Sequence, residues 1–195
     1  MNNDSNLTAA LTHLTKDGSA QMVNVGHKAI SSRRAVASAV VMTTPEVVGL
    51  LLSASLKKGD AFACARIAGI MAAKKTSELI PLCHSLLLTE VQVEFSADQK
   101  SGQVKIMTSC EVNGNTGVEM EALTAAAVSA LTIHDMCKAV DPAIVITDIK
   151  LEEKNGLLTH KDKDNLLEDI VVIASNLDLI HKEQYIKAFI SLEPI

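Results

Sequence analysis

The sequence contains few aromatic residues: it has no Trp, one Tyr and three Phe among 195 residues. Surfaces that bind single-stranded nucleic acid stack the bases on aromatic rings, so this composition argues against such a surface. Acidic side chains outnumber basic ones, 23 to 18, and the net charge is −5. A duplex-binding face needs the opposite balance. We therefore expect no nucleic-acid partner.

Long hydrophobic runs are also missing. No apolar stretch approaches the roughly 20 residues that cross a bilayer, and residues 1–6 are too polar for a signal peptide. We expect no membrane partner and a cytoplasmic location. The four cysteines form no C-x-x-C pair and have apolar neighbours, so we expect reduced thiols in the core. They are Cys64, Cys83, Cys110 and Cys137.

Hydrophobic periodicity and turn signals predict an α+β fold. Strands are expected at 35–42, 89–97, 103–113 and 144–151, and helices at 46–56, 61–75 and 118–140. This order predicts a ferredoxin-like antiparallel sheet with helices packed on one face. The composition changes after Gly156. We therefore assign residues 1–156 to one domain and residues 157–195 to an atypical C-terminal extension, with helices expected at 165–176 and 182–190.

The helix expected at 61–75 is apolar on nearly every face, which predicts burial on all sides. Arg66 is the only charged residue between Asp60 and Lys74. A buried guanidinium needs a partner, so we expect Arg66 to contact a carboxylate or a phosphate.

A first group of candidate site residues follows this helix, at Leu82, Cys83 and His84. A lone histidine in this position is most often structural. A cysteine beside a histidine is compatible with a metal site, but no matching ligand pair follows at zinc-finger spacing. We expect no metal centre.

A second group lies at the start of the helix expected at 118–140. Thr116 and Glu119 have the spacing of a capping box, which gives Glu119 a structural role. Glu121 lies about 200° round the helix from Glu119. Two interpretations of Glu121 stay open: a solvated first-turn carboxylate favoured by the helix dipole, or a functional group.

A third group lies near the end of the same helix. Asp135 and Lys138 are three residues apart and share a face. One interpretation is an ordinary surface ion pair. A functional role is favoured because an aspartate near a helix C-terminus opposes the dipole. Lys58 suits the C-terminal end of a helix and Lys154 the end of a strand.

The length of this helix constrains any site that uses both of its ends. Glu121 and Asp135 are about 21 Å apart along the axis, yet within about 40° of one face. One small ligand cannot touch both. A second copy related by a two-fold axis would bring the opposite end of its own helix alongside, and the alanine-rich run 122–130 would permit close approach. We therefore expect a homo-oligomer with sites at its interface.

Several runs of the sequence resemble the cyclic pyranopterin monophosphate synthase family, over roughly residues 11–156. They are Lys57-Lys58-Gly59-Asp60, Ala65-Arg66-Ile67-Ala68-Gly69-Ile70, Ala72-Ala73-Lys74-Lys75-Thr76, Leu79-Ile80-Pro81-Leu82-Cys83-His84, Thr116-Gly117-Val118-Glu119-Met120-Glu121-Ala122-Leu123-Thr124 and Leu131-Thr132-Ile133-His134-Asp135-Met136-Cys137-Lys138-Ala139-Val140.

The resemblance implies an enzyme of molybdenum cofactor biosynthesis that converts a 3′,8-cyclised dihydro-GTP to cyclic pyranopterin monophosphate with release of pyrophosphate. It also implies a hexamer of three dimers with sites at the dimer interface. By position, Asp135 would be catalytic together with Lys58 and Lys138, one lysine being tuned by burial. The residues implied to bind substrate are Leu82, Cys83, His84, Glu119, Met120, Glu121, Lys154 and Arg66. We expect no required cofactor, with magnesium acting only through the substrate triphosphate.

The sequence departs from this family's pattern at three places. Asn24 replaces an aspartate, Ser85 replaces a proline, and the residues after Lys154 differ from the usual glycine-rich segment. One alternative is therefore a weakened member that binds pterin or nucleotide without efficient turnover. A non-catalytic scaffold of the same fold and a metal-dependent cyclohydrolase are further alternatives.

Overall fold

A computed structural model describes residues 15, 17–154 and 157–158 of the chain. Its elements in chain order are β1 (Ser31–Met42), α1 (Pro45–Leu52), α2 (Ala61–Lys74), α3 (Thr76–Leu79), β2 (Leu88–Asp98), β3 (Gln103–Gly114), α4 (Glu119–Cys137), β4 (Val145–Lys154) and β5 (Leu157–Leu158). The domain border predicted after residue 156 and the helices predicted at 165–176 and 182–190 fall outside the described residues.

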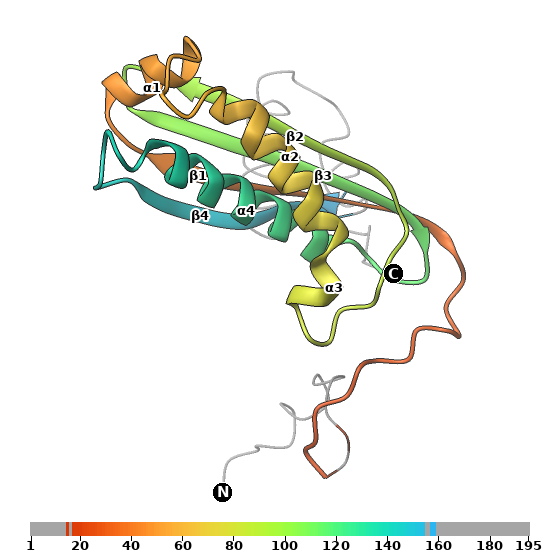
Figure 1. Cartoon of the computed structure of the whole chain (residues 1–195). Helices are drawn as coiled ribbons and strands as arrows, with labels where there is room; N and C mark the ends of the chain where they lie inside the picture. The colour runs from red at the N-terminus through yellow and green to blue at the C-terminus, as the bar shows by residue number, and fades with distance from the viewer. Residues whose placement is uncertain (1–14, 16, 155–156, 159–195) are drawn as a thin grey trace, which may run out of the picture. The chain divides into compact units, whose positions relative to one another are not determined.

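The strands form one sheet in the order β2-β3-β1-β4-β5. β1 pairs antiparallel with β3 and β4, and β2 pairs antiparallel with β3. The long helices α2 and α4 lie side by side on one face of the sheet (Figure 1). The predicted α+β fold with a ferredoxin-like antiparallel sheet is therefore confirmed. Each helix of the described residues is too short or too polar to cross a bilayer.

Capping side chains fix where the first two helices begin. The Thr44 side chain accepts a hydrogen bond from the Val47 amide at 3.3 Å, and Pro45 occupies the first helical position. The Asp60 carboxylate accepts a hydrogen bond from the Ala63 amide at 3.0 Å and starts α2. These two starts agree with the sequence analysis, because caps are local signals.

Two helix ends and one short helix differ from the prediction. α1 ends at Leu52 rather than at residue 56, and Ala54 follows with a positive φ of 50° that no helix contains. α4 ends at Cys137 rather than at residue 140. The four-residue helix α3 was not expected, because a single turn leaves no periodic pattern in the sequence.

Small residues bring α2 and α4 close together. The Ser129 hydroxyl donates a hydrogen bond to the Ala65 carbonyl at 3.1 Å, directly across the helix pair. A Cβ at Gly69 would collide with the Ser129 Oγ and lie 3.1 Å from the Ala125 carbonyl oxygen. The alanines expected to receive a second copy are instead buried within this chain, against its own sheet and α2. They are Ala122, Ala125, Ala126 and Ala130.

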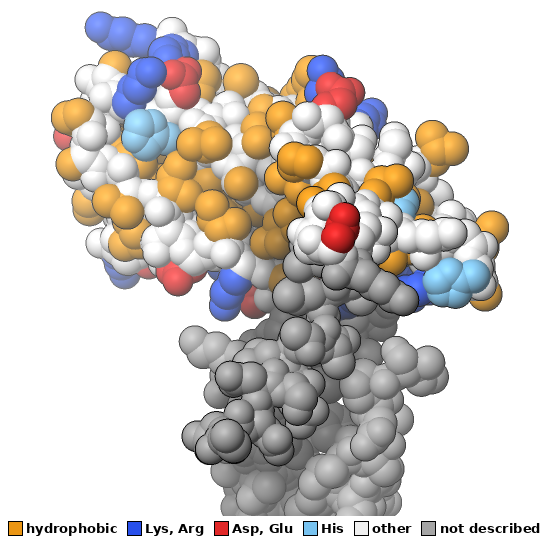
Figure 2. All heavy atoms as spheres, turned by 90° about the horizontal axis from the view of Figure 1, so that it is seen from below, with side chains coloured by type: hydrophobic (Ala, Val, Ile, Leu, Met, Phe, Trp, Pro, Cys, Tyr) orange, Lys and Arg blue, Asp and Glu red, His pale blue; other side chains and the backbone are white. Residues whose placement is uncertain are grey.

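The prediction that α2 is buried on every face is wrong for the described chain. One side packs on the sheet and α4, whereas Ile67 and Met71 on the other side are more than half exposed. Cys64 is exposed too, so it is not the core thiol that we expected, unlike Cys110 and Cys137. Figure 2 shows that many apolar side chains lie on a surface of the molecule. An apolar sequence indicates burial but not whether a single chain provides it.

The prediction of a carboxylate partner for Arg66 is also not met among the described residues, whereas that of a phosphate partner stays a prediction. The Arg66 Nε donates a hydrogen bond to the Val93 carbonyl of β2 at 3.1 Å, and its guanidinium lies 5.4 Å from the centre of the Phe95 ring. A carbonyl and an aromatic face are sufficient for a cation that keeps contact with water. Arg66 therefore stabilises the contact between α2 and the edge strand.

Candidate active site

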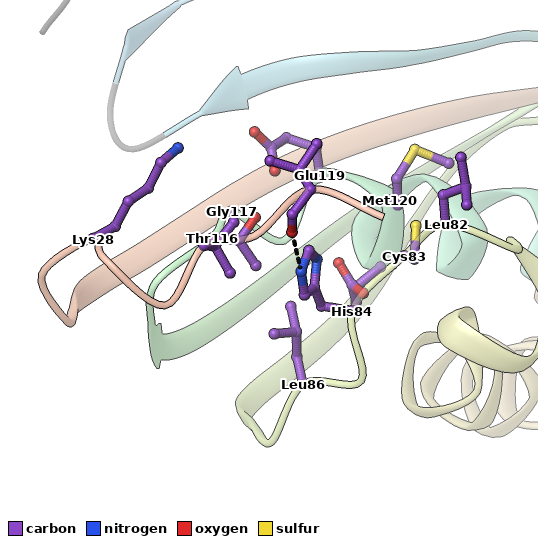
Figure 3. A pocket seen from close by; sticks show the side chains of 12 residues that line it. Lys28, Leu82, Cys83, His84, Leu86, Thr116, Gly117, Glu119 and Met120 are labelled. Carbon is purple, nitrogen blue, oxygen red and sulfur yellow. Dashed lines mark hydrogen bonds between the residues drawn. The ribbon is translucent and has the colours of Figure 1, made fainter. Parts of the chain in front are cut away.

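A pocket of about 270 Å³ lies beside the N-terminal end of α4. Three segments form it: an N-terminal stretch, the loop before β2, and the turn that leads into α4. The lining residues are Val23, Val25, Lys28, Leu82, Cys83, His84, Leu86, Thr116, Gly117, Glu119, Met120 and Glu121 (Figure 3). The residues implied to bind substrate are thus gathered here, except Lys154 and Arg66. The volume is slightly below the roughly 300–1,000 Å³ of typical ligand pockets.

Residues 21–28, which we call the arm, cover one side of this pocket. The His84 Nε2 bonds the Val23 carbonyl at 2.9 Å (Figure 3). Because a carbonyl oxygen only accepts hydrogen bonds, this Nε2 carries a hydrogen, and the Nδ1 remains for other contacts. The Asn115 Nδ2 donates to the Val25 carbonyl at 3.2 Å. The arm is therefore attached to the body of the protein by side chains from two different loops.

Glu121 is buried in the first turn of α4, with only 4% of its surface exposed. Burial raises the pKa of its carboxyl, and the charge of Glu119 adds to that rise. Burial and the Glu121 charge also raise the pKa of the Cys83 thiol, and that of Cys110 to about 12. The interpretation of Glu121 as a solvated carboxylate is therefore wrong, and both thiols are un-ionised at neutral pH.

Glu119 does not form the predicted capping box. The helix begins at Glu119 itself, and its N-cap residue Val118 makes no side-chain cap hydrogen bond. Glu119 is thus the first helical residue, whereas a capping box requires the third. Its carboxylate instead forms an ion pair with Lys154 at the end of β4. This contact brings Lys154 to the edge of the pocket.

At the other end of α4, Asp135 lies between two lysines. Its Oδ1 is 2.7 Å from the Lys138 Nζ, and its Oδ2 is 2.9 Å from the Lys58 Nζ. The Lys58 Nζ also donates to the Asp135 backbone carbonyl at 2.7 Å. The hydrogen bonds from Lys138 and then Lys58, followed by their charges, lower the pKa of Asp135 to about 2. Asp135 is therefore an ionised acceptor that orients two ammonium groups.

The structure therefore brings Lys58, which sequence reasoning placed at the end of a different helix, to Asp135 and Lys138. The side chains of Lys58 and Lys138 are 44% and 54% exposed. The burial expected for one of these lysines is accordingly absent within the described chain. Arg66 lies in neither this cluster nor the pocket.

Sequence reasoning missed the part of the arm that lines the pocket. Val23, Val25 and Lys28 lie more than 50 residues before the other lining segments, and the family's pattern drew attention only to Asn24 in this stretch. The substitution at Asn24 is tolerated locally, because the Asn24 Oδ1 accepts a hydrogen bond from the Gly26 amide at 2.9 Å. An aspartate oxygen would accept the same bond. Ser85 is exposed, and nothing in the structure explains its presence.

We find no candidate metal centre among the described residues. They contain no group of three or more His, Cys, Asp and Glu side chains placed to hold an ion. Cys83, His84, Glu119 and Glu121 all line the pocket, but they form no such group.

A comparison of the sequence with models of protein families finds a match to the model described as the MoaC family. The match extends over residues 22–156, which is more than half of the chain. It includes the arm from residue 22 onward, the pocket and the Asp135 cluster.

Proposed function

The chain belongs to the MoaC family, whose members act in molybdenum cofactor biosynthesis, and from this premise we propose a specific reaction. The protein converts a 3′,8-cyclised dihydro-GTP to cyclic pyranopterin monophosphate and releases pyrophosphate. It is thus a lyase that acts on a small-molecule substrate.

The cluster of Asp135, Lys58 and Lys138 is the observation that carries this proposal. Opening a purine-derived ring system and closing a cyclic phosphate both require proton transfers. Because the pKa of Asp135 is about 2, this carboxylate holds and orients the lysines rather than donating a proton. The ammonium groups are then the proton donors of the cluster, and they stabilise negative charge on a departing phosphate group.

The pocket at the other end of α4 is proposed to hold the ring system. Leu82 and Met120 offer apolar contact, and the Glu121 carboxyl offers a polar group inside the pocket. Because Glu121 is buried, a hydrogen bond between its carboxyl and ring N–H groups would not compete with bulk water. Lys154 and Glu119 close one edge of the pocket.

The proposed reaction requires both ends of α4 at one substrate. Glu121 and Asp135 are about 21 Å apart along the helix, so the cluster of one copy must face the pocket of another. The pocket of a single chain is small for a nucleotide, which also favours a shared site. We propose a homo-oligomer of this kind, and the resemblance adds the expectation of three dimers.

No resident cofactor is part of the proposal. Magnesium would act through the triphosphate of the substrate, since phosphate oxygens and water are the ligands that it prefers. The Mg²⁺ dependence of turnover, measured with and without a chelator, tests this point.

Incubation of the full-length protein with the cyclised dihydro-GTP tests the proposed reaction. We expect stoichiometric release of pyrophosphate and formation of cyclic pyranopterin monophosphate, both followed by mass spectrometry. A folded sample that binds the substrate but releases no pyrophosphate would favour the weakened-member alternative. That alternative rests on the departures from the family's pattern at Asn24, at Ser85 and after Lys154.

A further inference from the structure

The turn that carries Lys138 is exposed to solvent. Lys138, Ala139 and Val140 follow α4 and are all exposed, so apolar packing within the described chain does not hold this turn in place. The next residue, Asp141, is buried, with only 9% of its surface exposed. A buried carboxylate needs hydrogen-bond partners, and those partners show what Asp141 holds together.

Asp141 connects the end of α4 to the link between β1 and α1. Its Oδ2 accepts a hydrogen bond from the Thr43 hydroxyl at 2.7 Å, and its Oδ1 accepts one from the Ala143 amide at 2.9 Å. These two bonds, that from Thr43 first, lower the pKa of the Asp141 carboxyl. Figure 1 shows the link from β1 to α1 and the turn from α4 to β4 at the same end of the sheet. One ionised side chain thus joins two segments that lie far apart in the sequence.

Thr43 is itself fixed in place. Its amide donates to the Gly102 carbonyl, in the turn between β2 and β3, at 2.8 Å. Gly102 has a positive φ of 67°, and a Cβ there would collide with the Thr43 carbonyl oxygen, so the two backbones are in close contact. Thr43 also directly precedes Thr44, the N-cap residue of α1. It therefore gives Asp141 a rigid point of attachment.

The position of Lys138 depends on this attachment. The Lys138 amide donates to the His134 carbonyl at 2.8 Å, and the Asp141 amide donates to the Cys137 carbonyl at 3.1 Å. Without the side-chain bonds of Asp141, such backbone bonds at the end of a helix would open more often, because helix ends fray. The Lys138 Nζ, now 2.7 Å from the Asp135 Oδ1, would then spend less time on that carboxylate.

We propose that Asp141 is a positioning residue for the Asp135 cluster and that it acts by holding the turn of Lys138 against Thr43. This inference rests on the proposed function, because that function gives Lys138 its part in proton transfer. Asp141 does not line the pocket, and both of its carboxylate oxygens have partners within the chain. Its loss should therefore change kcat more than KM, since the pocket lies at the other end of α4.

Titration of the Asp135 carboxyl by carbon-13 NMR tests the positioning without any reaction, with the signal assigned by its absence in Asp135→Asn. In the wild type the pKa of Asp135 is about 2, and the hydrogen bond from Lys138 is the largest cause. Its signal should therefore hardly move between about pH 6 and about pH 3.5. In Asp141→Ala and in Thr43→Val the carboxyl should begin to titrate within this range.

The matched control is Ser38→Ala. It removes another hydrogen bond from a β1 hydroxyl to a carboxylate, that of the Ser38 Oγ to the Glu152 Oε1 at 2.6 Å. Ser38 is as well buried as Asp141 but lies in neither the pocket nor the cluster. Ser38→Ala should leave both the titration of Asp135 and kcat unchanged.

Turnover of the cyclised dihydro-GTP gives the second readout. Asp141→Ala should lower kcat about 10- to 100-fold, the loss that a small misplacement of a reacting group causes, and leave KM within about threefold. Thr43→Val should lower kcat by a smaller factor, because the bond to Ala143 remains. Asp141→Asn and Thr43→Ser should retain kcat near that of the wild type, since both pairs of side chains can still form a hydrogen bond. Asp141→Ala should cause no further loss of kcat in the Lys138→Gln background.

Three results would each overturn the inference: an Asp135 titration that is unchanged in both Asp141→Ala and Thr43→Val, a loss of kcat as large in Ser38→Ala as in Asp141→Ala, or a further loss in the Lys138→Gln background. If Asp141→Ala does not fold, Thr43→Val, which keeps the carboxylate, decides the question. A wild type without turnover would contradict the proposed function, whereas the NMR titration would still show whether Asp141 positions Lys138.

Discussion

The two ends of α4 hold acidic groups in opposite environments. Glu121, in the first turn, is 4% exposed, and burial raises the pKa of its carboxyl. Asp135, near the last turn, has a side chain that is 58% exposed, and two lysines lower its pKa to about 2. One end is therefore suited to holding a ligand away from water, and the other to charge and proton transfer.

The pKa shifts of Glu121 and Asp135 are both opposite to those that the helix macrodipole would cause. The N-terminal end of a helix stabilises a negative charge and should lower the pKa of Glu121, whereas the C-terminal end should raise that of Asp135. The structure places Glu121 out of water and Asp135 within hydrogen-bond distance of two ammonium groups. Burial and specific partners therefore outweigh the dipole at both ends, which shows that the tertiary environment determines these properties.

The largest effect on turnover is expected when the negative charge of Asp135, at the exposed end of α4, is removed. Asp135→Asn keeps the size of the side chain but removes the negative charge that attracts the ammonium groups of Lys58 and Lys138. We expect turnover to fall about 1,000-fold, within the range found for groups that support proton transfer. The measurement is the rate of pyrophosphate release at saturating substrate.

The matched control for this variant is Asp148→Asn, an exposed aspartate on β4 whose φ of 53° an asparagine tolerates. It should leave turnover unchanged. Since Asp135 is exposed, its variant should also melt within a few degrees of the wild type. Turnover of Asp135→Asn within tenfold of the wild type would contradict the role given to the cluster.

A second prediction concerns the middle of α4, where this helix packs against α2. In Gly69→Ala the new Cβ collides with the Ser129 Oγ, which is itself bonded to the Ala65 carbonyl. We expect a loss of about 1–3 kcal/mol in the free energy of unfolding, as for other overpacked sites. Urea denaturation measures it, and Ala68→Gly, one residue away on the same helix, controls for helix propensity. An unchanged midpoint for Gly69→Ala would show that α2 and α4 can separate.

A third prediction concerns the buried end and its pH dependence. Because the pKa of Glu121 in the folded chain lies above its ordinary value of 4.5, the folded state binds this proton more tightly than the unfolded state. The contribution of this carboxyl to the stability of the wild type therefore falls as the pH rises from 4.5 through the raised pKa. Glu121→Gln has no such proton, so its stability relative to the wild type should be greater at pH 7 than at pH 4.5.

Urea midpoints of both proteins at the two pH values measure this difference. The same variant should raise the KM for the cyclised substrate about tenfold, because a charged or acidic hydrogen-bond partner is lost. A constant stability difference between pH 4.5 and pH 7 would mean that Glu121 is as well solvated as in the unfolded chain.

The smallest effect is expected at the edge of the pocket. Lys154→Gln removes the ion pair between Lys154 and Glu119. The Lys154 side chain is 55% exposed. An exposed pair contributes less than about 1 kcal/mol to stability, so the urea midpoint should move only slightly. Lys150→Gln, which removes the pair with Glu152 on the same strand, is the matched control. If Lys154→Gln lost much more stability than Lys150→Gln, the ion pair between Lys154 and Glu119 would be important for the stability of the fold.

Local signals were sufficient to predict most of the fold. Val91, Val93 and Phe95 alternate along the strand expected at 89–97, and this strand, β2, pairs with the next one, β3. Thr44 and Asp60 cap α1 and α2 next to the starts of the helices expected at 46–56 and 61–75. These features act over a few residues, so the sequence contains them completely.

Properties that depend on distant parts of the chain were not predictable in the same way. The burial of Glu121 and the partner of Glu119 depend on where the arm and β4 pass. The sequence spacing indicated that Asp135 and Lys138 share a face, but only the fold brings Lys58 to them. Arg66 shows the opposite error, because a charge in an apolar helix was interpreted as buried when that side of the helix is exposed.

The central claim is that one copy supplies the pocket and another supplies the Asp135 cluster. Mixing Asp135→Asn with Glu121→Gln chains, after joint unfolding and refolding, tests it directly, once each variant alone is shown to be impaired at low substrate concentration. In mixed dimers one of the two sites then combines an intact pocket with an intact cluster, so random mixing should restore about a quarter of the wild-type sites. Turnover of the mixture no higher than the average of the two variants measured separately would contradict the account.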